Sequence, residues 1–124
     1  MAKPELAVLK EKTIIGLLEN VILILDGNKR KKLVAKIDTG ATKSSIDTGL
    51  ASELGLGPVI KSRMIKSAHG SKLRPVIEAT IEIAGKMIRS EFTLADRTHL
   101  KFSVLIGQNI LKEGFLIDPS SQLK

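Results

Sequence analysis

Short runs of Val, Ile and Leu recur along the chain, separated by glycine, proline and polar residues. Runs of this length with turn residues between them are typical of antiparallel β-strands rather than of alternating strands and helices. We therefore expect a mainly β protein. The pattern predicts strands over residues 14–25 (with a break near Glu19 and Asn20), 33–38, 44–46, 59–67, 73–83, 86–94 and 115–117.

Turn and helix signals lie between these runs. Asp26-Gly27-Asn28 is a strong hairpin-turn sequence, and His69-Gly70-Ser71 and Ala84-Gly85 are further hairpin candidates. Asp47 and Thr48 precede a short segment closed by Gly55, which predicts a capped helix over residues 50–54, and a second short helix is expected over residues 108–113. Because no repeat, linker or low-complexity segment interrupts the pattern, we expect a single domain over residues 1–124.

The strand predicted over residues 33–38 runs directly into Asp38-Thr39-Gly40-Ala41. A catalytic carboxylate needs a rigid strand behind it, a hydroxyl group beside it, and then a residue without a Cβ, so that the backbone can turn tightly and leave room for a substrate. Asp38, Thr39 and Gly40 meet these needs in order, although the same three residue types also form ordinary turns. The tripeptide is the leading candidate for a catalytic site.

A second motif lies near the other end of the chain, where the apolar run 102–106 ends at Gly107 and a short amphipathic segment follows. Together the two motifs resemble the retropepsin-like aspartic proteases, in which a hydrophobic segment ending in glycine packs beside the Asp-Thr-Gly loop. More narrowly, residues 35–45 and 115–120 are similar to the prokaryotic retropepsin-like family often labelled "ATP-dependent zinc protease". The resemblance implies a closed acid-protease barrel with one or two short helices.

The same resemblance implies a site. Asp38 would be the acid–base group, Thr39 would hold the loop through its hydroxyl, and Gly40 would line the substrate channel. A hairpin over residues 64–75 would act as a flap over the substrate. The implied substrate-binding residues are Ala41, His69, Gly70, Ile106 and Gly107.

One catalytic Asp in a chain of this length implies that the second comes from an identical chain across a twofold axis. We therefore expect a homodimer in which two Asp38 carboxylates share a proton and activate a water molecule. The predicted activity is that of an aspartic endopeptidase acting on a peptide or protein substrate, which the positive charge of the chain could make an acidic one.

Two positions depart from the viral retropepsin pattern, which commonly has an acidic residue four places after the catalytic Asp and an arginine directly after the later glycine. Here these positions are Thr42 and Gln108. Both members of that ion pair are absent together, so a hydrogen bond between Thr42 and Gln108 would replace it.

Asp47-Thr48-Gly49 repeats the tripeptide nine residues later. It cannot supply the second catalytic acid, because each catalytic loop needs its own strand and its own packing segment, and the chain has a single apolar segment ending in glycine. Asp47 is instead expected to cap the helix that follows it.

Composition narrows the remaining choices. The chain has 124 residues, of which 43% are hydrophobic, and it has no cysteine, which excludes disulfides, thiol nucleophiles and thiolate metal sites. The most hydrophobic stretch, residues 21–25, is far shorter than a bilayer span, and the first five residues carry charge and proline. We expect a soluble cytoplasmic protein with no membrane partner.

The formal net charge of +7 raises the question of nucleic-acid binding. With three Phe and neither Tyr nor Trp, the chain offers almost no stacking surface, so a nucleic-acid partner is not expected. The densest basic cluster is best read as a solvated turn, with acidic peptides or RNA as alternative partners. It consists of Lys29, Arg30, Lys31 and Lys32.

Cofactor chemistry finds no support in the sequence. The two histidines, His69 and His99, lie far apart, no His-Glu-x-x-His motif occurs, and no glycine loop of the phosphate-binding type is present. We expect neither a metal nor another cofactor. The alternative to an endopeptidase is a catalytically silent retropepsin-like dimer that binds acidic peptide tails or RNA.

Overall fold

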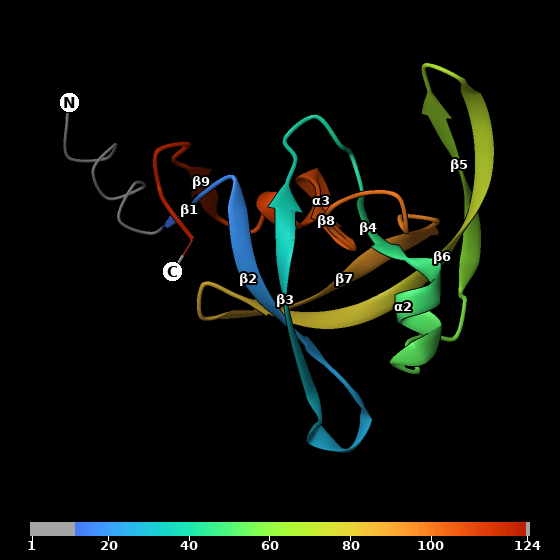
Figure 1. Cartoon of the computed structure of the whole chain (residues 1–124), viewed down its shortest axis with the longest axis horizontal. Helices are drawn as coiled ribbons and strands as arrows, with labels where there is room; N and C mark the ends of the chain where they lie inside the picture. Colours follow the sequence, from blue (N-terminus) through green and yellow to red (C-terminus); the bar gives the residue numbers. More distant parts are fainter. Residues whose placement is uncertain (1–11, 124) are drawn as a thin grey trace.

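The computed structural model describes residues 12–123, and Figure 1 shows their arrangement. Within these residues the chain forms nine strands, two short α-helices and one 3₁₀ turn. Six of the strands close into a barrel, in the order β2-β3-β8-β4-β7-β6 and back to β2. These six strands are β2 (Leu18–Ile24), β3 (Arg30–Ile37), β8 (Val104–Ile106), β4 (Ser44–Asp47), β7 (Lys86–Ala95) and β6 (Gly70–Ile83).

The barrel closes where β2 pairs with β6, antiparallel, with Val21 opposite Ile83. On the other side, β8 lies parallel to β3 and antiparallel to β4, so it joins two segments that follow each other in the sequence. The predicted closed, mainly β barrel is therefore confirmed. The strand β8 lies between β3 and β4 and is therefore next to the loop that links these two strands.

Alternating residues of the barrel strands point inward, as the two-residue period of a strand requires. On β6 these are Ile77, Ala79, Ile81 and Ile83, all at most 4% exposed. They pack with the inward residues of the other strands into one apolar core, in which each buried aliphatic side chain contributes about 1.5–3 kcal/mol. The largest fully buried members from the other strands are Val21, Leu23, Ile46, Phe92, Val104 and Ile106.

The remaining strand of the large sheet, β5 (Lys61–Ser67), pairs only with the first half of β6. The resulting β5–β6 hairpin rises away from the barrel at the right of Figure 1. Its turn lies at Ala68 and His69. A hairpin was predicted over residues 64–75, and the structure confirms it.

Short elements complete the fold. The helix α2 (Thr48–Glu53) follows β4, and α3 (Gln108–Leu111) follows β8. The strands β1 (Thr13–Ile15) and β9 (Phe115–Ile117) form a separate parallel pair. Neither helix of the described region has the length and apolar character needed to span a membrane.

The first predicted strand region is corrected by the structure. Its break lies at Gly16 and Leu17, not at Glu19 and Asn20, which are part of β2. The Gly16 main-chain N–H donates to the Glu19 carboxylate at 2.9 Å, so this polar side chain serves the turn before the strand instead of interrupting the strand.

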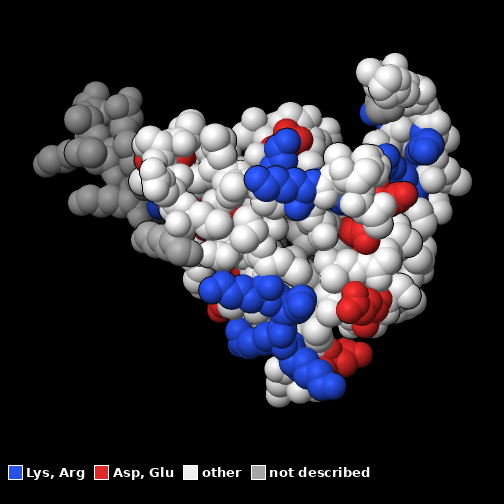
Figure 2. Space-filling model, viewed as in Figure 1, with Lys and Arg blue, Asp and Glu red and all other residues white. Residues whose placement is uncertain are grey.

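The predicted hairpin turn at Asp26-Gly27-Asn28 is confirmed as η1 (Asp26–Asn28), which joins β2 to β3. Gly27 and Asn28 have φ values of 71° and 61°, the left-handed conformation that such a turn requires. The basic cluster follows directly, with Arg30, Lys31 and Lys32 exposed at the start of β3. Figure 2 shows Lys and Arg gathered over this hairpin, and again beside the β5–β6 hairpin.

Candidate active site

Asp38 stands directly after β3, half-buried at the end of the strand. Its main-chain N–H donates to the carbonyl of Ile106 on β8 at 2.9 Å, which continues the β3–β8 pairing by one further bond. The carboxylate in turn accepts a hydrogen bond at Oδ1 from the main-chain N–H of Gly40, also at 2.9 Å. A rigid strand and a tight loop thus fix the position of this carboxylate.

The loop after Asp38 rests on Gly107, and the approach is too close for any side chain. A Cβ at Gly107 would lie 2.6 Å from the carbonyl oxygen of Lys43 and 2.8 Å from that of Ala41. The next residue donates its main-chain N–H to the same Ala41 oxygen at 2.8 Å, and Asn109 donates its own to the Thr42 oxygen at 3.2 Å. The two motifs identified in the sequence therefore lie in direct contact.

Asn109, on α3, connects this contact to the rest of the barrel. Its side-chain oxygen accepts hydrogen bonds from the N–H and the hydroxyl of Ser44, at 2.9 and 2.8 Å. The Ser44 hydroxyl oxygen accepts the N–H of Gly107 at 2.9 Å. The Asn109 amide nitrogen donates to the Ser90 hydroxyl at 3.0 Å and to the Glu91 carbonyl at 2.9 Å. One side chain thus links α3, β4 and β7.

The hydrogen bond expected between Thr42 and Gln108 is not formed in the described structure. The Gln108 side-chain nitrogen donates instead to the main-chain carbonyl of Thr39, at 2.8 Å. Gln108 therefore holds the Asp-Thr-Gly loop itself, one residue from the carboxylate. The physical reason is that an amide reaches a backbone carbonyl of the loop without needing a charged partner.

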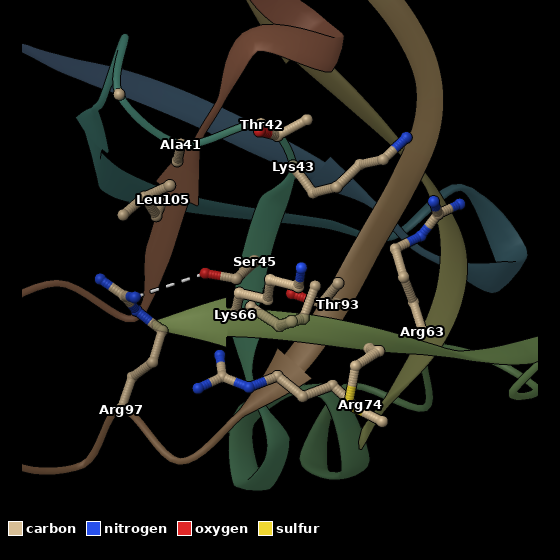
Figure 3. A pocket seen from close by; sticks show the side chains of 13 residues that line it. Ala41, Thr42, Lys43, Ser45, Arg63, Lys66, Arg74, Thr93, Arg97 and Leu105 are labelled. Carbon is tan, nitrogen blue, oxygen red and sulfur yellow. Dashed lines mark hydrogen bonds between the residues drawn. The ribbon is translucent and has the colours of Figure 1, made fainter. Parts of the chain in front are cut away.

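A hollow of about 540 Å³ lies between this loop and the β5–β6 hairpin, as Figure 3 shows. Gly40 and Ala41 form one side of it, and β5 and β6 contribute the opposite side. Among the residues that the structure describes, its lining contains five cationic side chains and no acidic one, so the hollow suits an anionic ligand. The five are Lys43, Arg63, Lys66, Arg74 and Arg97.

Glu91 compensates one end of this charge from outside the hollow. It forms ion pairs with Lys61 at 2.8 Å and with Arg63 at 3.1 Å. The hydrogen bond from Lys61 lowers the pKa of Glu91, and the charges of Lys61, Arg63 and Lys43 lower it further, while burial acts in the opposite direction. These two ion pairs connect β5 to β7.

Arg97 lies at the other end and comes from the segment between β7 and β8. It is 9% exposed, and its guanidinium donates from Nε to the Phe102 carbonyl at 2.9 Å and from one terminal nitrogen to the Ser45 hydroxyl at 3.3 Å. Burial and the nearby Arg74 lower the pKa of Arg97, whereas the negative charges of Asp47 and Asp38 raise it. No pattern in the sequence singled out this residue.

The structure separates the residues predicted to bind substrate. Ala41 lines the hollow together with Gly40, as expected. His69 and Gly70 line a second hollow of about 620 Å³, on the side of the hairpin that faces Asp96 and His99.

Two of the predicted substrate contacts lie inside the protein. Ile106 is fully buried in the core, and Gly107 packs beneath the loop. Leu105 takes the place that we expected for Ile106, because alternation along β8 turns Leu105 toward the hollow when its neighbours point inward. That alternation was visible in the sequence and could have identified Leu105.

Asp47 has the capping role predicted for it. Its Oδ2 accepts from the N–H of Leu50 at 3.1 Å, at the start of α2. Its Oδ1 accepts from the main-chain N–H of Arg97 at 2.7 Å. The buried carboxylate therefore uses both oxygens, one for the helix and one for the segment that carries Arg97.

The family label for zinc finds no matching donor set in the part of the chain that the structure describes. Over residues 12–123, no group of three or more His, Asp or Glu side chains is arranged to hold a metal ion. The two histidines both line the second hollow, as does Asp96. We derive no step of the chemistry through a metal.

Comparisons with known proteins agree with this geometry. A family model described as "RimB-like: Retropepsin-like aspartic endopeptidase RimB" matches residues 50–123. Two curated proteins, each named "Probable alpha-L-glutamate ligase", are 35% identical to the chain. The one from Desulfotalea psychrophila matches over 66 residues (52% of this chain), and the one from Shewanella pealeana matches over 63 residues (50%). The matched segment is 14% of either relative, so the chain spans only a small part of their length.

Two solved structures share the fold. A Legionella pneumophila protein of unknown function superposes with a TM-score of 0.64 and 20% identity, over 90% of this chain and 97% of that one. The protease of simian foamy virus superposes with a TM-score of 0.56 and 20% identity, over 77% of this chain and 91% of that one. At this identity the likeness establishes the fold alone.

Proposed function

Because the chain belongs to the RimB-like family of retropepsin-like aspartic endopeptidases, we propose that it hydrolyses peptide bonds and that Asp38 is its catalytic acid–base residue. The family match begins at residue 50, after Asp38, so the choice of this residue rests on its geometry. The observation that carries it is the Asp38 carboxylate fixed at the end of β3, in the loop whose next residues line the hollow beneath the β5–β6 hairpin.

The proposed chemistry needs two such carboxylates, and each chain supplies one. A second copy related by a twofold axis would bring the second Asp38 to the same site. The two carboxylates would share a proton, so that one accepts a proton from water while the other donates a proton to the carbonyl oxygen of the scissile bond. The water oxygen then bonds to the carbonyl carbon, and the C–N bond breaks as the nitrogen takes up a proton. No covalent bond to the enzyme forms.

The proposed substrate is a peptide rich in acidic residues. The five cations that line the hollow beside the Asp38 loop and the net charge of +7 favour it. The two relatives named as glutamate ligases suggest glutamate in particular, as these names describe proteins that handle that residue. A catalytically silent dimer that binds acidic tails in the same hollow is the alternative, and the intact Asp38-Thr39-Gly40 loop argues against it.

The first test compares Asp38→Asn with Asp47→Asn. These are the same isosteric change at the first position of the two Asp-Thr-Gly copies. Cleavage of a glutamate-rich peptide, followed by mass spectrometry, should fall at least about a hundredfold in Asp38→Asn, because Asn cannot exchange a proton with its partner. Asn is itself a good N-cap, so a capping role alone predicts that Asp47→Asn changes little. The structure revises this: Asn has one acceptor oxygen where Asp47 uses two, so we expect about 1–2 kcal/mol of lost stability. Because Asp47 also holds the segment that carries Arg97, the comparison is made at saturating peptide, where the cleavage rate per folded molecule should persist.

The second test uses the same variant to ask whether the site is shared. Mixing wild-type protein with an equal amount of Asp38→Asn, with time for subunit exchange, should roughly halve the activity of the wild-type chains, since about half of them then lie in dimers with one acid. Full retention of activity, with sedimentation showing monomers, would contradict the shared site. Equal loss in Asp38→Asn and Asp47→Asn would contradict the assignment of Asp38.

A further inference from the structure

Arg74 and Arg97 come from different parts of the fold and line the same hollow. Arg74 lies on β6, in the half of the strand that belongs to the β5–β6 hairpin, and Arg97 lies in the barrel, between β7 and β8. Figure 3 shows both side chains in the lower part of the view, with the Arg74 guanidinium directed toward Arg97. Both residues also line the second hollow, so they stand where the two meet.

These two arginines differ from the others in the chain. All five arginines fall within the described residues, and Arg30, Arg63 and Arg89 each form an ion pair with a glutamate. Among residues 12–123, no carboxylate lies within 4.0 Å of the guanidinium of Arg74 or Arg97. Arg30 and Arg89 are exposed and Arg63 is half-buried, and each of the three has a counter-ion, whereas the half-buried Arg74 and the buried Arg97 have none.

This arrangement is unfavourable unless an anion joins it. A buried charge without a partner is costly, and a like charge nearby adds to the cost. The positive charge of Arg74 lowers the pKa of Arg97, in addition to the effect of burial. Guanidinium groups form paired hydrogen bonds to carboxylates, so one carboxylate placed between the two would satisfy both.

Arg97 is held ready for such a ligand by contacts that leave its guanidinium without an ion pair, although the charges of Asp47 and Asp38 offset part of the cost of its burial. Its partners are the Phe102 carbonyl, the Ser45 hydroxyl and, through its main-chain N–H, the Asp47 carboxylate. The first two are neutral acceptors that fix the direction of the guanidinium. Arg74, by contrast, lies on the β5–β6 hairpin, opposite Arg63.

We propose that Arg74 and Arg97 together bind one side-chain carboxylate of the substrate and that this carboxylate draws the β5–β6 hairpin onto the barrel. The inference rests on the proposed peptidase function and deepens it by naming the residues that select an acidic side chain. The closing of the hairpin then depends on substrate charge, because the two arginines repel each other until the carboxylate lies between them. A peptide with glutamine in place of glutamate lacks the charge that offsets this repulsion.

The test measures binding without catalysis, in the Asp38→Asn background. A fluorescent peptide rich in glutamate is compared with its glutamine counterpart by anisotropy. Arg74→Gln should weaken binding of the glutamate peptide about 10- to 100-fold, the range for hydrogen bonds to a charged group, and leave the glutamine peptide unchanged. Arg97→Gln should do the same, and the double variant should lose little more than either single variant, since both act on one carboxylate.

Arg30→Gln is the matched control, because it removes the same charge from an exposed site on β3, outside the hollow. An equal loss in Arg30→Gln would show a general effect of net charge and overturn the proposal. Arg97→Gln also removes two structural hydrogen bonds, so its thermal unfolding is measured alongside. Among residues 12–123 the side chain of Arg74 forms no hydrogen bond or ion pair, and Arg74→Gln alone therefore decides the matter if the other variant unfolds.

Hydrogen exchange gives a readout that affinity does not. The glutamate peptide should slow amide exchange over residues 70–75 in Asp38→Asn, and Arg74→Gln should remove this protection. Unchanged exchange on binding would refute the closing of the hairpin. Selective binding without any cleavage by the wild-type protein would overturn the peptidase function but not the role of the two arginines. Cleavage that does not distinguish glutamate from glutamine would overturn the role of the arginines but not the peptidase function.

Discussion

The side-chain oxygen of Asn109 accepts two hydrogen bonds from Ser44, a residue 65 positions earlier in the chain. Ser44 begins β4 directly after the Asp-Thr-Gly loop, and Asn109 lies two residues after Gly107. The pair therefore fixes the distance between the two segments that build the candidate site. Because Ser44 is fully buried, no water replaces these bonds if the amide is removed.

Asn109→Ala should lower the free energy of unfolding by about 2–4 kcal/mol, because it leaves the buried N–H of Ser44 without an acceptor and cuts the link to β7. Urea unfolding gives the value. Gln108→Ala, in the adjacent position, removes one exposed hydrogen bond to Thr39 and should cost less than about 1 kcal/mol. Similar losses in the two variants would mean that the Asn109 network contributes nothing beyond a single surface bond.

Gly107→Ala should disturb the Asp38 loop directly. The new Cβ would meet two main-chain carbonyls at 2.6 and 2.8 Å, and the Ala41 carbonyl cannot turn away without losing its hydrogen bond from Gln108, so we expect about 2–3 kcal/mol of lost stability and a matching fall in activity. Gly49→Ala is the control: its nearest contact is the Asp47 side chain at 3.2 Å, and alanine favours the helix. Thermal unfolding should rank the variants clearly, and a tolerated Gly107→Ala would mean that the loop is not seated as described.

Glu91 predicts a pH dependence of known sign. Its pKa is lowered below the ordinary 4.5, so its ion pairs stabilise the folded chain above that pH and are lost as the pH falls through the lowered value. Glu91→Gln should reduce the free energy of unfolding by about 0.5–1 kcal/mol at pH 7, since the side chains involved are partly exposed. The difference should shrink in acid and in high salt. A difference that stays constant from pH 7 to pH 3 would rule out the ionised carboxylate as its source.

The sequence was a good guide to the barrel and to the meeting of its two motifs. Both follow from local patterns: apolar runs that alternate along strands, and glycines where the chain turns or where backbones touch. Gly107 had to be a glycine because two carbonyls occupy the space of a side chain, and the resemblance to retropepsins placed it beside Asp38.

Arg97 could not be predicted in the same way. It lies in an irregular segment, and its direction is set by Asp47 and Ser45, which are 50 and 52 residues away. No periodicity or motif encodes such contacts. The expected pairing of Thr42 with Gln108 failed for a related reason, since the backbone carbonyl of Thr39 offered the amide a partner that no comparison of side chains could reveal.

One strand belongs to both the barrel and the hairpin, and it changes partner at a single residue. Residues 70–75 of β6 pair only with β5, residues 77–83 pair with β7, and the fully buried Val76 pairs with both Lys61 and Thr93. The hairpin can therefore bend about Val76, and its tip lies about 20 Å from that residue. A rotation of about 10° there would carry the tip by about 3–4 Å. Access to the hollow between the Asp38 loop and the hairpin can then be set by bending one continuous strand, with no loop rearranged and no barrel pairing broken.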